Sequence, residues 1–258
     1  MARRRLDVEL VGRKMMASRS AAREAIDAGN VEVRGVAKPK PATLVTSDVS
    51  IRIRRDKDYV GRGGYKLKGA LDDFGLKVKG SWALDIGSST GGFTDCLLQH
   101  GAVGVVALDV GYGQLDWMLR TDSRVNVIER TNFRYAIPEE LGAPFDLIVA
   151  DLSFISLVTV VYQLRAMGNK STDYILLVKP QFEVGRDEVG NGGIVRDPVL
   201  HATAVEKVAT ALEEQGIGLT RAVPSALRGA KGNIEFFVWG RSGERTFMKQ
   251  DIDAMVMN

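Results

Sequence analysis

The sequence predicts an α/β fold in which a mainly parallel sheet carries helices on both faces, preceded by a small α+β segment. Apolar runs of strand length alternate with helical patterns, the clearest of which spans 201–215. Strands that are apolar throughout are typical of a parallel sheet buried on both faces. The expected strands lie at 82–86, 103–110, 125–128, 145–151, 174–178, 219–223 and 234–239. We expect the last two, which are joined by a glycine-rich loop, to pair antiparallel.

The N-terminal segment differs from the rest of the chain in charge. Residues 1–57 show two short helical patterns followed by strand patterns, and they carry 14 Lys and Arg against 7 Asp and Glu. The remainder carries 21 against 25, so the positive excess is confined to this segment. Such an asymmetry indicates a module that meets phosphates, although a solvated basic face without a ligand would have the same composition.

The junction between the two parts is rich in glycine. Gly61, Gly63 and Gly64 predict a bend or hinge at this point rather than a continued strand. The tail after about Arg241 carries no clear motif. The predicted organisation is a small domain at 1–57, a linker at 58–65, a large domain at 66–245 and a C-terminal tail at 246–258.

The composition excludes several kinds of site. The chain has a single cysteine, Cys96, and two histidines, which rules out a disulfide framework and a Cys/His zinc site, and we expect no metal. No apolar run approaches the length of a membrane span, and the basic N-terminus lacks an apolar signal segment. We therefore expect a cytoplasmic protein with no membrane partner.

The most informative stretch is 82–93, where an apolar strand pattern ends in a glycine-rich turn and a helical pattern begins at once. A strand, a tight loop and a helix N-terminus together form the arrangement that cradles a nucleotide-like cofactor at the carboxyl edge of a parallel sheet. The alternative is a glycine turn that only packs the strand against the helix. The residues expected to form the loop are Asp85, Gly87, Gly91, Gly92 and Phe93.

The charge and spacing of this loop favour one type of cofactor. The glycines follow the pattern Gly-x-x-x-Gly-Gly, which is not the dinucleotide fingerprint. A carboxylate at Asp85 would repel a pyrophosphate but suits a positively charged ligand such as S-adenosylmethionine. Asp109 closes the next strand, in the position that reads ribose hydroxyls in wound sheets.

Three further charged residues end or interrupt apolar strands. Asp151 ends the fourth expected strand, Lys179 ends the fifth, and Glu235 lies within the last. Charged groups in apolar strands are costly to bury without partners, and the carboxyl ends of parallel strands face one crevice. For Asp151 and Lys179 the alternative is a strand-end charge that reaches solvent. Lys66 has no such signal, and spacing alone does not single it out.

Taken together, these residues resemble two known modules. The large domain resembles the FtsJ-type ribose 2′-O-methyltransferases, a class I S-adenosylmethionine-dependent, Rossmann-like fold whose catalytic set runs Lys, Asp, Lys, Glu. The small domain resembles the S4-like RNA-binding module through Arg5-Leu-Asp, Ser18-Arg19, Ala22, Ile26, Gly29 and Val31. Both modules in this order, joined by Tyr-Val-Gly-Arg-Gly-Gly-Tyr-Lys-Leu, closely resemble the TlyA (haemolysin A-like) rRNA methyltransferases over about residues 3–240.

The resemblance implies methyl transfer from S-adenosylmethionine to cytidine 2′-hydroxyls of 16S or 23S ribosomal RNA, and it assigns residues to three roles. The implied catalytic set is Lys66, Asp151, Lys179 and Glu235, with Lys179 as the base or hydroxyl-orienting group. The implied cofactor residues are Asp85, Gly87, Ser88, Ser89, Thr90, Gly91, Gly92, Phe93, Asp109, Asn132 and Asp151. The implied RNA-binding residues are Arg3, Arg4, Arg5, Arg19, Lys38, Lys40 and Arg62.

Other functions stay open on the sequence alone. A non-catalytic RNA-binding or ribosome-assembly factor could retain a cofactor fold, although an intact set of four charged residues argues against it. The older name of the family suggests a haemolysin, but the sequence has no amphipathic membrane-inserting stretch that would support this function. An NAD-dependent oxidoreductase conflicts with the glycine spacing. The expected partners are ribosomal RNA or ribosomal subunits, and we expect a monomer.

Overall fold

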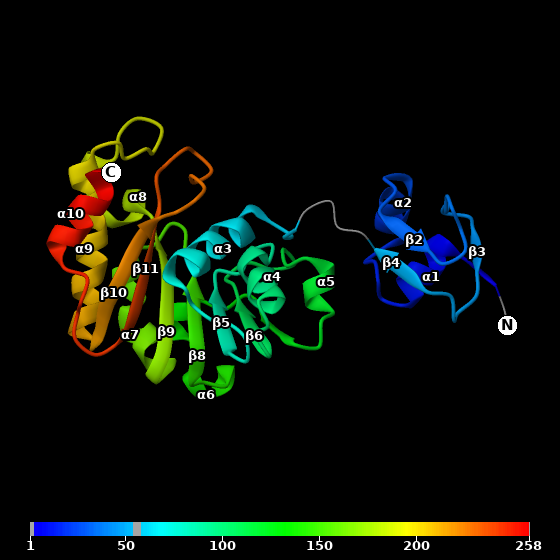
Figure 1. Cartoon of the computed structure of the whole chain (residues 1–258), viewed down its shortest axis with the longest axis horizontal. Coiled ribbons are helices and arrows are strands. Elements are labelled where there is room, and N and C mark those ends of the chain that lie inside the picture. Colours follow the sequence, from blue (N-terminus) through cyan, green and yellow to red (C-terminus); the bar gives the residue numbers. More distant parts are fainter. Residues whose placement is uncertain (1–2, 54–57, 258) are drawn as a thin grey trace. The chain divides into compact units, whose positions relative to one another are not determined.

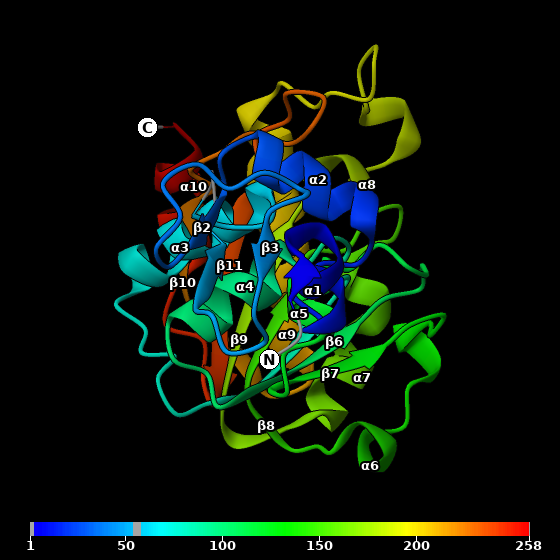
Figure 2. The ribbon, with the colours of Figure 1, turned by 90° about the vertical axis from the view of Figure 1, so that its right-hand side faces the viewer.

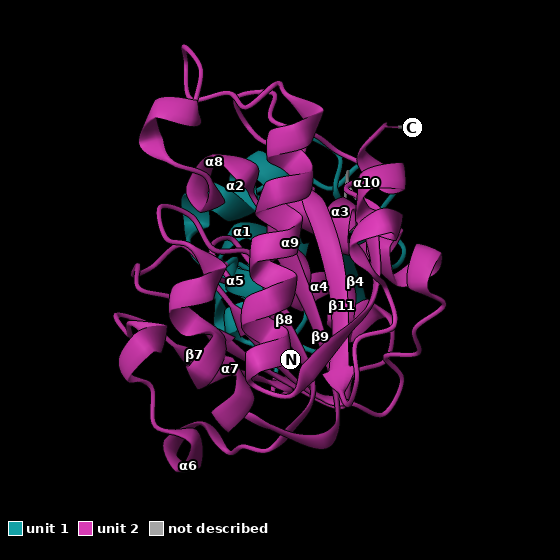
Figure 3. Ribbon diagram, turned by 90° about the vertical axis from the view of Figure 1, so that its left-hand side faces the viewer, with its two compact units in different colours: residues 1–58, 116–122 teal, residues 59–115, 123–258 magenta. Residues whose placement is uncertain are grey.

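The computed structural model describes residues 3–53 and 58–257. The chain forms two compact units, one of residues 1–58 and 116–122 and the other of residues 59–115 and 123–258 (Figures 1 and 3). The first unit thus includes residues 116–122, which the sequence prediction placed in the large domain. We describe each unit by itself.

The small unit is built from short elements around one apolar cluster. Two antiparallel pairs of strands, β1 with β3 and β2 with β4, accompany the helices α1 and α2, which Figure 2 shows in dark blue. Its elements are β1 (Arg4–Arg5), α1 (Leu6–Gly12), α2 (Arg19–Asp27), β2 (Val31–Val33), β3 (Leu44–Val45) and β4 (Ile51–Ile53). The cluster consists of Leu6, Leu10, Ala22, Ile26, Val31, Val33 and Val45.

The ends of α2 follow the expected signals. The Ser18 hydroxyl accepts a hydrogen bond of 3.2 Å from the Ala21 N–H, which satisfies one of the free donors at the helix start. Gly29 follows the last turn with φ of +80°, a conformation that glycine adopts without strain. The pairing of β1 with β3 was not predicted, because two-residue strands leave no alternation in the sequence.

The large unit contains a seven-stranded sheet in the order β10-β11-β9-β8-β5-β6-β7. The strands are β5 (Trp82–Ile86), β6 (Gly104–Leu108), β7 (Val125–Ile128), β8 (Phe145–Ala150), β9 (Gly168–Val178), β10 (Ile217–Pro224) and β11 (Phe236–Ser242). All neighbouring pairs from β7 to β9 are parallel, whereas β11 runs antiparallel to both β9 and β10. The predicted α/β class and the antiparallel finish are both confirmed.

Helices cover both faces of this sheet because its strands are apolar on both sides. Leu84 and Ile86 of β5 belong to the cluster that contains α9, whereas Phe237 of β11 meets Phe93 of α4 with ring centroids 5.9 Å apart. Figure 3 shows α9 and α10 lying over one face. The helices are α3 (Arg62–Phe74), α4 (Gly92–Gln99), α5 (Trp117–Arg120), η1 (Phe133–Tyr135), α6 (Pro138–Leu141), η2 (Leu157–Val160), α7 (Val161–Ala166), α8 (Pro180–Glu183), η3 (Arg186–Glu188), α9 (Pro198–Glu214) and α10 (Lys249–Met257).

The glycines of the junction lie in a helix, which corrects the predicted hinge and the linker at 58–65. α3 begins at Arg62 with Gly61 as its N-cap residue. A Cβ atom on Gly64 would stand 2.4 Å from the Tyr59 side chain, and one on Gly92 would stand 2.8 Å from the Gly64 nitrogen. These glycines therefore allow α3 and α4 to approach closely, a packing requirement that has the same sequence signature as a bend.

The C-terminal tail is also part of the large unit. α10 packs against α9, and Ile252 at its centre is fully buried. Arg245 fixes the approach to this helix through hydrogen bonds of 2.8 and 2.6 Å to the Glu206 carboxylate. The predicted boundary at 245 therefore divides a segment that folds with the sheet.

The order of the strands creates one switch point, between β5 and β8. From β5 the chain proceeds to β6 and β7 on one side, and it then crosses to β8 on the other. Ligands of open α/β sheets bind at the carboxyl edge beside such a point. The Asp151 N–H, directly after β8, donates to the Ile86 carbonyl at the end of β5, so the two strand ends are held together.

Candidate active site

A glycine turn leaves β5 at the switch point and opens a cavity. Gly87 and Gly91 have φ of +81° and +97°, which other residues adopt only with strain. A Cβ atom on Gly87 would lie 2.6 Å from the Asp151 carbonyl oxygen, so glycine is required there for close approach as well. The cavity has a volume of about 340 Å³ and is lined by Arg62, Gly63, Lys66, Gly87, Ser88, Ser89, Thr90, Gly92, Phe93, Asp151 and Ala230.

Asp85 lies behind this turn and not on the cavity surface. It is fully buried, and one carboxylate oxygen, Oδ2, accepts a hydrogen bond of 2.6 Å from the Thr94 hydroxyl. The other oxygen, Oδ1, is buried without a hydrogen-bond partner. Burial raises the pKa of Asp85 to about 7, and the nearby charges of Asp151 and Asp109 act in the same direction. A direct contact between Asp85 and a ligand is therefore not present in this arrangement.

Asp109 and Asn132, two other expected cofactor residues, bind the backbone. The Asp109 carboxylate accepts hydrogen bonds from the N–H groups of Ser89, at 2.8 Å, and Gly111, at 2.6 Å. Asn132 caps the short helix η1 by accepting from the Arg134 N–H at 3.1 Å. Asp109 thus holds the glycine turn in place, while neither side chain is among those that line the cavity.

The four charged residues of the expected catalytic set come together in two ion pairs. Lys66 Nζ lies 2.5 Å from Glu235 Oε2, and both side chains are buried. Lys179 Nζ lies 2.6 Å from Asp151 Oδ1, although this ion pair lacks the alignment of a hydrogen bond. The aligned bond of Lys179 goes to the Ser153 hydroxyl at 2.9 Å. Each lysine therefore faces a carboxylate.

A second cavity of about 530 Å³ adjoins the first. Lys66 and Asp151 line the smaller cavity, Lys179 and Glu235 line the larger one, and Ala230 lines both. The two ion pairs consequently lie where the cavities meet. The segment 181–198 contributes to the wall of the larger cavity, whose lining is Ser153, Phe154, Lys179, Gln181, Phe182, Arg186, Val189, Gly190, Gly193, Gly229, Ala230, Lys231, Asn233 and Glu235.

Sequence reasoning missed Ser153 and Phe154, which follow Asp151 in the same loop. Phe154 is 92% exposed, has φ of +65°, and packs its ring 5.5 Å from that of Phe182. An exposed aromatic side chain in a left-handed conformation is unusual and is typical of functional sites. The only sequence signal was the run Asp-Leu-Ser-Phe after an apolar strand, in which a lone Phe looks like an ordinary apolar residue.

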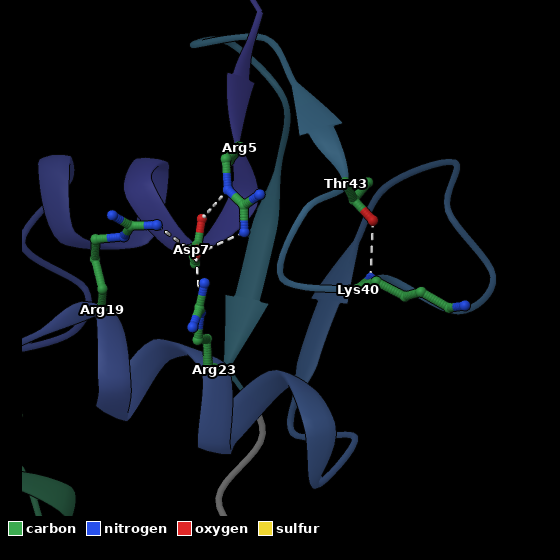
Figure 4. Close-up of polar contacts among 6 residues, drawn as sticks. All are labelled: Arg5, Asp7, Arg19, Arg23, Lys40 and Thr43. Atoms are coloured by element: carbon green, nitrogen blue, oxygen red, sulfur yellow. Dashed lines mark hydrogen bonds and ion pairs between the residues drawn. The ribbon is translucent and has the colours of Figure 1, made fainter.

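In the small unit, three arginines converge on one buried carboxylate (Figure 4). Asp7 is fully buried and accepts hydrogen bonds from Arg5 at 3.0 and 3.1 Å, from Arg19 at 3.2 Å and from Arg23 at 3.2 Å. The Arg5 guanidinium holds the pKa of Asp7 well below its usual range, and the other two act in the same direction. Three cations around one anion leave a net positive group with a fixed geometry.

The remaining expected RNA-binding residues are placed differently. The side chains of Arg3, Arg4, Lys38 and Lys40 are exposed in the small unit. Arg62, which belongs to the large unit, is exposed at the start of α3, donates to the Arg228 carbonyl at 2.8 Å and lines the smaller cavity.

A sheet in this order, with a glycine turn at its switch point, defines the class: a Rossmann-like methyltransferase. The fold resembles an S-adenosylmethionine-dependent methyltransferase from Listeria monocytogenes with a TM-score of 0.52 at 14% identity, covering 71% of this chain and 99% of that chain. The FtsJ-like methyltransferase model matches residues 59–242, and the chain belongs to this family.

Two further relatives extend the similarity to most of the chain. The 16S/23S rRNA (cytidine-2′-O)-methyltransferase TlyA of Mycobacterium tuberculosis is 49% identical over 245 residues, which are 94% of this chain and 91% of that protein. The solved structure of a protein named as a hemolysin, from Streptococcus thermophilus, has a TM-score of 0.75 at 36% identity and covers 100% of this chain and 95% of that chain. Among the helices described here, none is both long and apolar enough to cross a membrane.

Proposed function

We propose that the protein transfers a methyl group from S-adenosylmethionine to the 2′-hydroxyl of cytidine in ribosomal RNA. The observation that carries the proposal is that two ion pairs, Lys66–Glu235 and Lys179–Asp151, lie at the meeting point of two cavities. The name of the Mycobacterium tuberculosis relative, an rRNA (cytidine-2′-O)-methyltransferase, supports this substrate. The smaller cavity would hold the methyl donor and the larger one the nucleotide.

The residues around the smaller cavity suit S-adenosylmethionine. When bound, this cofactor supplies an electrophilic methyl group on a positively charged sulfur. The carboxylate of Asp151 on the cavity wall, and that of Asp85 with its unpartnered oxygen behind the turn, favour a cation there. The backbone of Gly87–Phe93 would enclose the donor, and Asp109 would keep this turn in shape by holding the Ser89 N–H.

We assign Lys179 as the group that orients the ribose hydroxyl and accepts its proton. A ribose hydroxyl is a poor nucleophile near neutral pH, so a positioned side chain must orient it and accept its proton as the new bond forms. Asp151 and Ser153 hold Lys179 Nζ from two directions, at 2.6 and 2.9 Å, and so fix where it would meet the hydroxyl. Lys66, fixed by Glu235, would orient the ribose from the other side.

The larger cavity has the features of a site for an unstacked nucleotide. Proteins recognise single-stranded RNA bases by stacking them on aromatic side chains and by hydrogen bonds to their edges. Phe154 and Phe182 offer aromatic surface on the wall, and Gln181 offers an amide group. Lys231 and Arg186 on the same wall are suited to the flanking phosphates.

The small unit would bind the RNA backbone away from the reacting nucleotide, as an S4-like module. The exposed side chains of Arg3, Arg4, Lys38 and Lys40 are the proposed phosphate contacts. Arg5 and Arg19 would contribute through the arginine cluster on Asp7, which fixes their direction. Substrates of this kind lie in the cytoplasm on ribosomal subunits.

One labelling experiment tests the function. Purified small and large ribosomal subunits from cells that lack this activity are incubated with the protein and S-adenosylmethionine carrying a tritiated methyl group. We expect label in rRNA that maps to the 2′-oxygen of a cytidine. Binding of S-adenosylmethionine by calorimetry, with no transfer to either subunit, would instead favour a non-catalytic RNA-binding factor.

A further inference from the structure

Glu183, at the end of α8, is a buried carboxylate that the proposed chemistry does not use. It is 2% exposed, and both carboxylate oxygens have partners in the segment that follows β8. The Ser156 hydroxyl donates to Oε2 at 2.5 Å, and the Leu157 N–H donates to Oε1 at 2.8 Å. Lys207 of α9 donates to the Glu183 carbonyl at 2.6 Å and so anchors the residue from behind.

These contacts place Glu183 at one end of a loop whose other end carries the proposed active site. The loop runs from Asp151 to Leu157. Lys179 holds its start through Asp151 and Ser153, and Glu183, four residues further along the chain than Lys179, holds its end. The segment after β9 therefore binds the loop after β8 at two points, through Lys179 at its start and Glu183 at its end.

The loop between these two points of contact is strained. Phe154, in its middle, has φ of +65° although it is not a glycine, and its side chain is 92% exposed. Such a conformation persists only where the surroundings fix the backbone on both sides. Release of one end would allow the loop to relax, and Ser153 and Asp151 would then move relative to Lys179.

We propose that Glu183 is a positioning residue for methyl transfer, which holds the loop 151–157 so that Lys179 stays in register with Asp151 and Ser153. This inference rests on the proposed function of Lys179. Glu183 does not line either cavity, so its effect is transmitted through the loop. The chemical step should depend on it, while binding of S-adenosylmethionine should not.

Glu183→Ala and Glu183→Gln separate this role from simple loss of charge. Glutamine keeps an oxygen for the Leu157 N–H, and its amide nitrogen can donate to the Ser156 oxygen. Both hydrogen bonds of residue 183 to the end of the loop are therefore retained. We expect kcat of Glu183→Ala to fall by about 10- to 100-fold, since small misplacements near the reacting atoms have effects of this size. Glu183→Gln should restore most of kcat, and the Kd for S-adenosylmethionine should stay near that of the wild type in both.

Glu206→Ala is the matched control for stability. Glu206 also bridges two segments through a charged contact, but its carboxylate binds Arg245 and not the loop 151–157. We expect Glu206→Ala to lower Tm without changing kcat. If Glu183→Ala is too unstable to assay, Ser156→Ala removes the Oε2 bond and is measured in its place, with the same expected fall in kcat.

The outcomes are distinct. A lower kcat in folded Glu183→Ala, with unchanged cofactor Kd and recovery in Glu183→Gln, supports the inference. A kcat equal to that of the wild type, with only Tm reduced, overturns it, and so does an equal loss in Glu183→Gln and Glu183→Ala. Lys179→Ala is assayed alongside: if it is inactive while Glu183→Ala is fully active, only the positioning role fails, whereas an active Lys179→Ala overturns the proposed function of Lys179.

Discussion

Lys66 and Glu235 are 169 residues apart in the chain, yet they form a buried ion pair of 2.5 Å. Lys66 belongs to α3, at the start of the large unit, and Glu235 directly precedes β11, its last strand. The side chains are 9% and 4% exposed, so water compensates little for the loss of either partner. The pair therefore connects both ends of the methyltransferase unit at the point where the two cavities meet.

Removal of one partner of this pair should be costly. Glu235→Ala leaves the Lys66 ammonium buried without its carboxylate, and breaking a buried pair in this way typically costs about 3–5 kcal/mol. We expect a loss of that order in the free energy of unfolding measured with urea. The double variant Lys66→Met/Glu235→Met replaces both charges by side chains of similar volume and should regain most of the stability, while methylation remains absent. Equal stability of Glu235→Ala and the wild type would contradict the buried pair.

Lys179 should be required for turnover but not for cofactor binding. Its side chain lines the larger cavity and not the smaller one. In Lys179→Met we expect the rate of methyl transfer to fall by about 10²–10⁴-fold, the usual contribution of a general base. The affinity for S-adenosylmethionine, measured by calorimetry, should stay near the wild-type value.

Lys170→Met provides the control for this variant. Lys170 lies on β9, near the end opposite to the one that Lys179 directly follows, and its side chain is exposed. The Lys170→Met variant should transfer the methyl group at the wild-type rate. Appreciable turnover by Lys179→Met would exclude Lys179 as the base.

Asp85 predicts a pH dependence of stability. An unfolded aspartate ionises near pH ~4, whereas burial raises the pKa of Asp85 in the folded protein to about 7. Between these two pKa values the folded protein binds one more proton than the unfolded chain. The contribution of Asp85 to stability therefore falls as pH rises from about 4 to about 7, and it stays constant at higher pH. Asp85→Asn should lack this slope. The free energy of unfolding of the variant, measured with urea on the ligand-free protein, should therefore rise relative to that of the wild type between pH 5 and pH 8. A constant difference across this range would count against a protonated Asp85.

The glycines of α3 should be intolerant of even a methyl group. Alanine at position 64 would place its Cβ 2.4 Å from the Tyr59 side chain, and overpacking of this kind costs about 1–3 kcal/mol. Gly12 in α1 has no atom within 4 Å of the same position, so Gly12→Ala should be neutral or stabilise by up to about 1 kcal/mol through helix propensity. Thermal unfolding of the two variants measures the contrast, and similar Tm values would argue that Tyr59 is not packed against Gly64.

Arg4 should contribute to RNA affinity through charge alone. Its side chain is exposed in the small unit. We expect Arg4→Ala to weaken binding to rRNA at low salt and to reduce the slope of log affinity against log salt by about 1, the signature of one lost phosphate contact. Filter binding over a range of KCl concentrations measures this slope. Lys170→Ala, which removes an exposed charge from β9, should leave the slope unchanged.

The sheet was predictable because its strands are buried on both faces, which leaves predominantly apolar runs such as 82–86 and 174–178 in the sequence. Asp151, Lys179 and Glu235 were visible for the same reason, as charges that interrupt or end those runs. Lys66 was not, because a lysine on an amphipathic helix looks solvated until the strand that buries it is known. The role of Lys66 came from the family resemblance and not from its spacing.

Other features could not be read from local sequence because distant residues decide them. Gly64 looks like a hinge until Tyr59 and Gly92 are seen against it. Asp85 looks like a ligand contact until Thr94 and the glycine turn are seen to cover it. The tail seemed featureless because only Ile252 is deeply buried in α10, which leaves too weak an apolar stripe to predict a docked helix.

The insertion of β11 between β9 and β10 has a consequence for how the enzyme is made. β10 is synthesised first, yet it reaches the rest of the sheet only through β11, and Glu235 directly precedes that strand. A nascent chain that has emerged only as far as Lys179 carries Lys66, Asp151 and Lys179 but no partner for Lys66. Under the proposed function, the four charged residues can therefore come together only after the last strand of the sheet has left the ribosome.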